Sequence, residues 1–93
     1  MRVVLGERAR ADLWLQLDWL ETLNPKAAKQ AEARIVASFR ILGEQPRIGR
    51  EVRADGLREW SIHFGAYGYV IQYRVLSDHV RVVRLYHAAQ DRP

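Results

Sequence analysis

The sequence contains no cysteine, and this absence excludes several kinds of chemistry. Without cysteine there is no disulfide framework, no thiolate nucleophile and no cysteine-ligated zinc or iron–sulfur cluster. Apolar runs such as residues 3–5 fall far below the roughly 18 residues of a membrane span, and the first residues do not begin a signal peptide. We therefore expect a cytoplasmic protein that does not associate with membranes.

Lysine is scarce as well, because thirteen of the fifteen basic residues are arginine. Set against eleven acidic residues, they give a formal net charge of +4, which suits an acidic partner. Guanidinium groups favour fixed, bidentate contacts to carboxylate or phosphate, so this composition favours specific recognition over a diffuse basic tail. The chain also lacks linkers, low-complexity tracts and repeats, and we expect one domain over residues 1–93.

A short strand and a helix are predicted at the start of the chain. Residues 1–5 are apolar and β-branched, which is typical of a strand. Over residues 7–23, apolar side chains recur three and four positions apart and form one inward stripe: Ala9, Leu13, Leu17 and Leu20. The opposite side of this helix carries Leu15 and Trp19. Two interpretations of this pair stay open, a snorkelling surface aromatic and a contact with a partner or a second copy.

A second helix is predicted directly after the first. Asn24 is a favourable N-cap, and Pro25 is tolerated at the first helical position. The pattern stops near Gly43, after about 18 residues, with a proline just beyond. Because the connecting loop is so short, the two helices should form an antiparallel hairpin.

The remaining chain predicts three consecutive antiparallel strands over residues 57–64, 67–76 and 79–86. The breaks at residues 65–66 and 77–78 have the length of hairpin turns. The predicted fold class is therefore α+β: an N-terminal strand, an antiparallel helical hairpin and a three-stranded antiparallel meander.

Alternation along these strands predicts which side chains face the core. Trp60 shares one face with Ile62 and Phe64, whereas strict alternation in the last strand sets Val80 and Val82 opposite Val83 and Leu85. It likewise sets Arg81 and Arg84 on opposite sides of that strand. Apolar residues on both faces predict that the second face of the sheet meets a partner.

Short motifs follow one another in a definite order. They are Ala9 with Asp12-Leu13, Pro46-x-x-Gly49-Arg50, Leu57-Arg58, Gly68-Tyr69-Val70-Ile71, Tyr73-Arg74-Val75 and Tyr86-His87-Ala88-Ala89-Gln90-Asp91. Together with the predicted elements, they resemble the RelE/ParE superfamily of toxins over nearly the whole chain. The resemblance implies a toxin of a type II toxin–antitoxin pair. A small antitoxin would neutralise it by laying a helix and an extended tail over the hydrophobic groove beside the sheet.

Two activities occur in that superfamily. RelE-like members cleave mRNA on the ribosome, using basic side chains and a terminal Tyr or His, whereas ParE-like members bind DNA gyrase. Nuclease members usually read Tyr-Arg-Val-Ile-Tyr where this chain has Tyr69-Val70-Ile71-Gln72-Tyr73, so Val70 occupies the position of a functional Arg. The resemblance therefore favours a ParE-like gyrase inhibitor. A ribosome-dependent mRNA endonuclease is the first alternative, and a non-toxic interaction module is the second.

The residues expected to bind the target or the antitoxin are basic or aromatic. They are Arg50, Arg53, Arg58, Arg74, Arg81, Tyr86 and His87. In the nuclease alternative His87 serves as acid or base, because imidazole titrates near neutrality, and Arg58 contacts phosphate. The arginines at 50, 53 and 58 can instead be solvated charges paired with nearby carboxylates.

Inhibition by binding requires no catalytic residue, and we expect neither a metal nor a cofactor. The three histidines have no metal-ligand spacing. The assembly is left open between a homodimer and a heterotetramer with the antitoxin.

Overall fold

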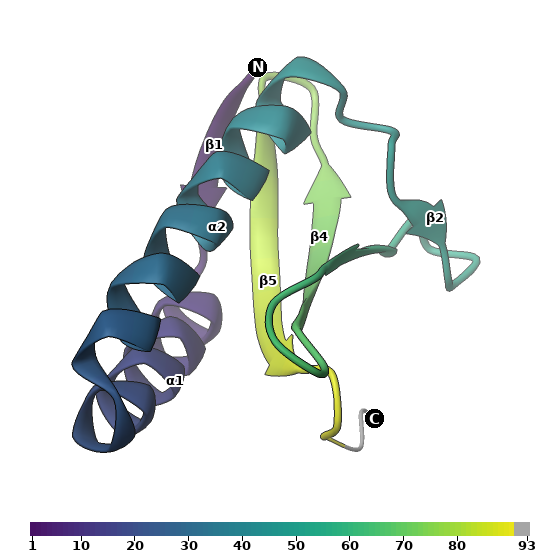
Figure 1. Cartoon of the computed structure of the whole chain (residues 1–93). Coiled ribbons are helices and arrows are strands. Elements are labelled where there is room, and N and C mark those ends of the chain that lie inside the picture. The colour runs from purple at the N-terminus through teal and green to yellow at the C-terminus, as the bar shows by residue number, and fades with distance from the viewer. Residues whose placement is uncertain (91–93) are drawn as a thin grey trace.

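A helical hairpin covers one face of a five-stranded sheet in the computed structural model, which describes residues 1–90 (Figure 1). The elements are β1 (Arg2–Leu5), α1 (Glu7–Leu23), α2 (Pro25–Glu44), β2 (Arg50–Glu51), β3 (Arg58–Ile62), β4 (Tyr69–Val75) and β5 (His79–His87). The strand order is β1-β5-β4-β3-β2, with β1 parallel to β5 and the other neighbours antiparallel. The α+β class, the helical hairpin and the three-stranded meander are confirmed.

Both helices form where the sequence predicts them. Helix α1 has the predicted bounds and buries Ala9, while the other members of its inward stripe pack against the core. The Asn24 side chain accepts a hydrogen bond from the Ala27 backbone N–H at 3.1 Å, which caps α2. Helix α2 runs for 20 residues and ends at Glu44, one residue beyond the predicted Gly43.

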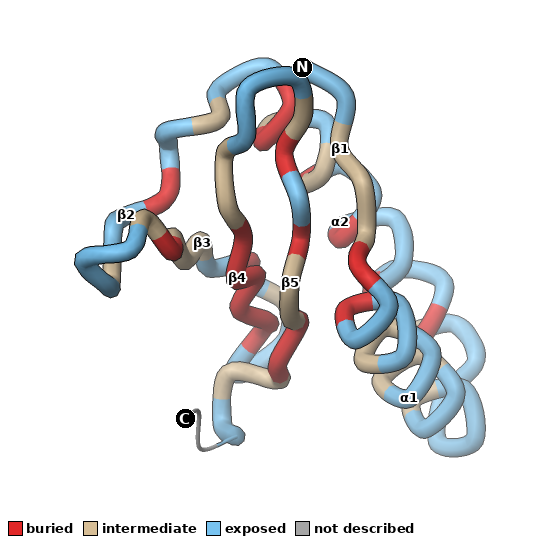
Figure 2. The backbone as a smooth tube through the Cα atoms, turned by 180° about the vertical axis from the view of Figure 1, so that it is seen from behind, coloured by how far each residue is buried: buried red, intermediate tan, exposed pale blue. Residues whose placement is uncertain are grey.

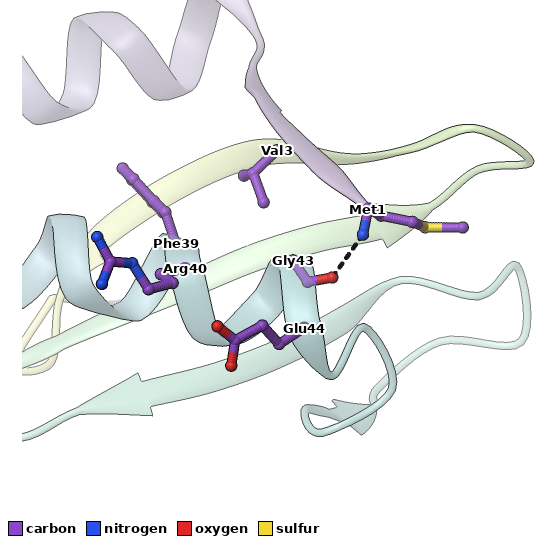
Figure 3. Close-up of a pocket in the computed structure, with 6 residues that line it drawn as sticks. All are labelled: Met1, Val3, Phe39, Arg40, Gly43 and Glu44. Carbon is purple, nitrogen blue, oxygen red and sulfur yellow. Dashed lines mark hydrogen bonds between the residues drawn. The ribbon is translucent and has the colours of Figure 1, made fainter.

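The end of α2 is joined to the start of the chain (Figure 3). The Met1 amino group donates to the Gly43 carbonyl oxygen at 2.7 Å, so that a positive charge lies at the negative end of the helix. A Cβ atom on Gly43 would lie 2.6 Å from the Met1 carbonyl oxygen. The hollow of about 570 Å³ around this contact, walled by Val3 and Phe39, therefore belongs to the seam between β1 and α2.

The core lies between the hairpin and the middle of the sheet. Buried residues gather on β4 and β5 in Figure 2, and β4 supplies Tyr69, Ile71 and Tyr73 to the core. The predicted inward face of β3 is confirmed, because Ile62 is buried and Trp60 packs against the same core.

The connection between β3 and β4 differs from the predicted two-residue turn. Strand β3 ends at Ile62 and β4 begins at Tyr69, so residues 63–68 form a six-residue loop. Gly65 and Gly68 both have positive φ angles, +62° and +95°. Both angles lie in the left-handed region that glycine adopts readily, and β3 and β4 are shorter than alternation alone predicts.

A β-bulge in β5 corrects the predicted alternation. Gln72 pairs with Arg84 but Tyr73 pairs with Val82, which leaves Val83 as an extra residue. Val82 and Leu85 consequently both face the core, and the prediction that they lie on opposite faces was wrong. The prediction that Arg81 and Arg84 lie on opposite sides was wrong for the same reason.

The two-residue strand β2 was also missed, because it is too short to show a period.

Candidate functional site

The face of the sheet away from the helices carries a concave region of about 360 Å³, called here the outer hollow. It is lined by Val52, Arg53, Leu57, Glu59, Gln72, Arg74, Val83, Arg84 and Tyr86. The strand register places Glu59, Gln72 and Arg84 side by side across β3, β4 and β5. Gln72 Nε2 donates to Glu59 Oε2 at 2.7 Å, so the floor of the outer hollow is polar and internally bonded.

Asp12 of α1 holds the Arg84 side chain in place through hydrogen bonds. Its carboxylate accepts hydrogen bonds from Arg84 Nε at 2.8 Å, from Arg84 Nη2 at 3.1 Å and from the Leu85 backbone N–H at 2.9 Å. The hydrogen bond to Asp12 raises the pKa of Arg84. Strand β1 pairs with β5 only as far as Val82. Beyond that point the Asp12 carboxylate bonds to the edge of β5 through the Leu85 N–H. This contact explains the helix motif that contains Asp12.

Tyr86 lies beside Arg84 on the outer face. The Arg84 guanidinium carbon is 4.7 Å from the centroid of the Tyr86 ring, a cation–π contact. The Tyr86 hydroxyl is buried and has no hydrogen-bond partner within residues 1–90. Val70, which pairs with Tyr86 on β4, is 5% exposed. The position at which the resemblance implies a functional arginine is thus a buried aliphatic residue.

Two of the predicted arginines meet at one carboxylate. Arg53 Nη2 and Arg74 Nη2 both approach Asp55 Oδ2, at 2.9 and 3.1 Å, and Arg74 Nη1 also donates to the Asp55 carbonyl oxygen at 2.9 Å. The hydrogen bond from the Arg74 side chain is the main reason that the pKa of Asp55 lies below its ordinary value of 3.8. Both arginines therefore border the outer hollow as members of an ion-pair network.

This network predicts a measurable titration. Because the folded-state pKa of Asp55 is lowered, the stabilisation by this interaction is fully present above the ordinary pKa of 3.8 and is lost as the pH falls through the lowered folded-state pKa. In Arg74→Ala the Asp55 carboxyl should titrate closer to 3.8, as followed by carboxyl ¹³C NMR. Arg50→Ala serves as the control, because Arg50 pairs with Glu59 instead. An identical Asp55 titration in the wild type and Arg74→Ala would contradict the assignment.

Arg58 supports the backbone. Its Nη1 donates to the Gly49 carbonyl oxygen at 2.7 Å, and its Nη2 lies 3.8 Å from Glu51 Oε1. The Tyr73 hydroxyl accepts from the Gly49 N–H at 2.9 Å and donates to the Pro46 carbonyl oxygen at 2.7 Å. The motif around Pro46 and Gly49 is therefore a loop clamped onto the sheet by two side chains.

The other predicted cations are more open to solvent. Arg50 is 3.9 Å from Glu59 Oε1, and its side chain is 78% exposed, so this pair contributes little to stability. Arg81 is exposed and forms no ion pair with another residue of the described chain. These two residues remain predictions as contacts for a partner.

His87 lies apart from the arginines. It pairs with Tyr69, and its ring packs edge-on against the Tyr69 ring at 5.8 Å. Arg58 pairs with Tyr73, which places it four residues away along the strands, roughly 13 Å, and two strands across. The Nδ1 atom of His87 accepts from the Ala89 N–H at 3.2 Å, so a neutral ring carries its proton on Nε2. The structure does not bring His87 together with the predicted phosphate-binding arginines.

His87 instead borders the predicted partner patch. Leu15 and Trp19 are 70% and 57% exposed on α1, which confirms that this pair points outward. They share a hollow of about 430 Å³, called here the α1 hollow, with His87 and the turn that follows β5. Asp91, the last residue of the C-terminal motif, lies outside the described residues.

Two features are absent from residues 1–90. No group of three or more His, Asp or Glu side chains there could hold a metal ion. Neither helix of that part is long and apolar enough to cross a membrane.

Sequence reasoning missed the polar floor of the outer hollow. Glu59 and Gln72 alternate with core residues on their strands, but alternation does not show that they meet across the sheet. The sequence identifies Asp12 only as part of a helix motif. A charged residue close to the inward stripe of an amphipathic helix was the available signal for a buried contact.

Several known proteins are similar to this chain over nearly its whole length. The family described as "ParE toxin of type II toxin-antitoxin system, parDE" matches residues 3–92. The chain is 39% identical to Toxin RelE3 and 37% identical to Toxin RelE1, both of Caulobacter vibrioides. Each alignment covers 97% of this chain, and the two alignments cover 97% of Toxin RelE3 and 96% of Toxin RelE1. A solved structure titled "Chromosomal ParDE TA system from P. aeruginosa" shares the fold, with a TM-score of 0.75 at 23% identity over 95% of this chain and 96% of that chain.

Proposed function

The chain belongs to the ParE toxin family of type II toxin–antitoxin systems, and we propose that it inhibits DNA gyrase by binding, without cutting RNA. A small cognate antitoxin neutralises it. The net charge of +4 favours an acidic antitoxin, and coupled folding of a disordered antitoxin gives tight binding when enough surface is buried. Because gyrase acts on the chromosome, the proposed site of action is the cytoplasm.

One observation carries the choice of a binding mechanism, namely the aliphatic side chain at Val70 on the outer face. Cleavage through a 2′-hydroxyl needs a fixed positive charge near the phosphorane and a group that moves the 2′ proton. Val70 supplies neither of them. Arg53 and Arg74 hold Asp55, and His87 lies apart from them. This arrangement supports recognition of a macromolecular surface through the rim of the outer hollow.

A second candidate function, ribosome-dependent mRNA cleavage, is favoured by Arg84 and Tyr86. These two residues line the outer hollow together, and the Tyr86 hydroxyl has no partner within the described chain. In this alternative the Tyr86 hydroxyl forms a hydrogen bond with the 2′-hydroxyl and Arg84 faces the phosphate. The relatives in Caulobacter vibrioides bear RelE names, which is compatible with it. A non-toxic module that binds only its antitoxin is the third possibility.

Induced expression separates these candidates. We expect growth arrest, loss of negative supercoiling in a reporter plasmid and unchanged mRNA 5′ ends, all reversed by the co-expressed antitoxin. Cuts within codons of translated mRNA, lost in His87→Ala or Tyr86→Phe, would support the second candidate. Normal growth at confirmed soluble expression would support the third.

A further inference from the structure

The outward side of α1 carries an apolar ridge, which we call the α1 ridge. Its members are spaced four residues apart along the helix: Ala11, Leu15, Trp19 and Leu23. The side chain of Leu23 is 64% exposed, similar to Leu15 and Trp19, and the outward turns of α1 are pale blue in Figure 2. A spacing of four places these residues on one i±4n row, the kind of row that meets a second helix in the commonest class of helix packing.

The α1 hollow lies beside this ridge and has fixed walls. It is lined by Leu15, Gln16, Trp19, His87, Ala89 and Gln90. The Gln90 side-chain oxygen accepts from Gln16 Nε2 at 2.9 Å and from the His87 backbone N–H at 2.7 Å. These two bonds tie the C-terminal turn to α1. The exposed ring of Tyr67, 5.5 Å from the His87 ring, extends the apolar surface further.

The α1 ridge is complementary to itself. If two copies meet with their α1 helices antiparallel about an axis through residue 17, Leu15 of one copy faces Trp19 of the second copy. Ala11 then faces Leu23 of the second copy, so a small residue meets a large one at each end. A twofold axis makes every such contact twice, as an isologous interface requires.

We propose that the α1 ridge joins two copies of this chain, with Trp19 of each copy inserted into the α1 hollow of the other. The ridge itself is uncharged and is flanked by exposed Asp18 as well as Arg8, so charge does not direct an acidic antitoxin to it. A second copy meets the patch with matching apolar side chains. This dimer does not depend on the identity of the toxin's target.

The available area predicts a weak dimer. Trp19 and Tyr67 are 57% and 63% exposed. Since an aromatic side chain has roughly 150–250 Å² of surface to bury, these two can bury on the order of 240 Å² more against a partner. With Leu15 and Leu23 the apolar area is about 350 Å² per copy. Full burial of these side chains in both copies accounts for about 700 Å², and polar groups around them must supply the rest of the roughly 1,200 Å² that marks the low end of specific interfaces. We therefore expect dissociation in the micromolar range.

Sedimentation velocity on the purified full chain, from about 1 to about 500 µM, should show a reversible monomer–dimer equilibrium. Trp19→Ala should weaken the dimer at least about fivefold, as expected for a residue seated in a pocket at the centre of an interface. Trp14→Ala is the matched control: Trp14 is 71% exposed but points about 140° away around the helix. The Trp14→Ala dimer should have the dissociation constant of the wild type. Both variants should have melting temperatures close to that of the wild type.

Three outcomes would overturn the proposal. The first is a chain that stays monomeric at every concentration. If Trp19→Ala then weakened antitoxin binding, the α1 ridge would be a contact for the antitoxin and not for a second copy. The second is an equal loss of dimer in Trp14→Ala and Trp19→Ala. The third is a strongly lowered melting temperature of Trp19→Ala with unchanged association, which would mean that Trp19 supports the monomer.

Discussion

Gly68→Ala is expected to destabilise the fold by about 4 kcal/mol and to lower its melting temperature by roughly 15–30 °C. Gly68 has φ +95°, where side chains are strained, and an added Cβ would overlap the Ile62 carbonyl oxygen at the end of β3. Its own carbonyl accepts from the Ala88 N–H at 2.9 Å, so the backbone there is held from two sides. Thermal unfolding followed by circular dichroism measures the effect.

Gly65→Ala is the matched control in the same loop. Gly65 also has a positive φ, +62°, but no atom lies within 4 Å of an added Cβ. Its substitution should therefore cost only the strain of the left-handed conformation, about 1–2 kcal/mol. Equal losses for the two variants would show that the close approach to Ile62 does not limit position 68.

Gly49→Ala is expected to cost about 3 kcal/mol, the second large effect. An added Cβ would lie 2.6 Å from the Tyr73 hydroxyl and 2.7 Å from the Glu59 carbonyl oxygen. The loop could make room only by breaking the hydrogen bonds of Tyr73 to Pro46 and Gly49. Denaturant unfolding of the purified variant measures the loss.

Tyr73→Phe tests the same clamp without adding an atom. Removing the hydroxyl leaves the Gly49 N–H and the Pro46 carbonyl without this partner, which should cost about 1–3 kcal/mol. If neither Gly49→Ala nor Tyr73→Phe shifted the denaturation midpoint, the loop would not be clamped as described. Such a result would reopen a functional role for the motif around Gly49.

Much of the fold could be predicted because local signals agreed with one another. The apolar stripe of α1, the cap at Asn24 and the proline that follows it define the hairpin without knowledge of the sheet. The bulge at Val83 could not be predicted, since it depends on how β5 pairs with β4. Strand β2 exists only through its pairing with β3, and two residues show no period.

The site could be predicted only in part. Sequence reasoning found the arginines and the outward position of Trp19, but it did not find which carboxylate each arginine meets. Asp12 and Leu85 are 73 positions apart in sequence, and Arg74 lies 19 positions from Asp55. These pairings arise from tertiary packing, and they decide which cations remain open to a partner.

Supercoiling by purified DNA gyrase, assayed with increasing amounts of the purified chain, tests the central claim most directly. Inhibition by the wild type that persists in a His87→Ala, Tyr86→Phe double variant, at a higher concentration if these side chains contact gyrase, is the predicted result, because the proposed mechanism uses neither side chain to transfer a proton. Undiminished supercoiling, combined with ribosome-dependent mRNA cleavage by the wild type that the double variant lacks, would contradict it.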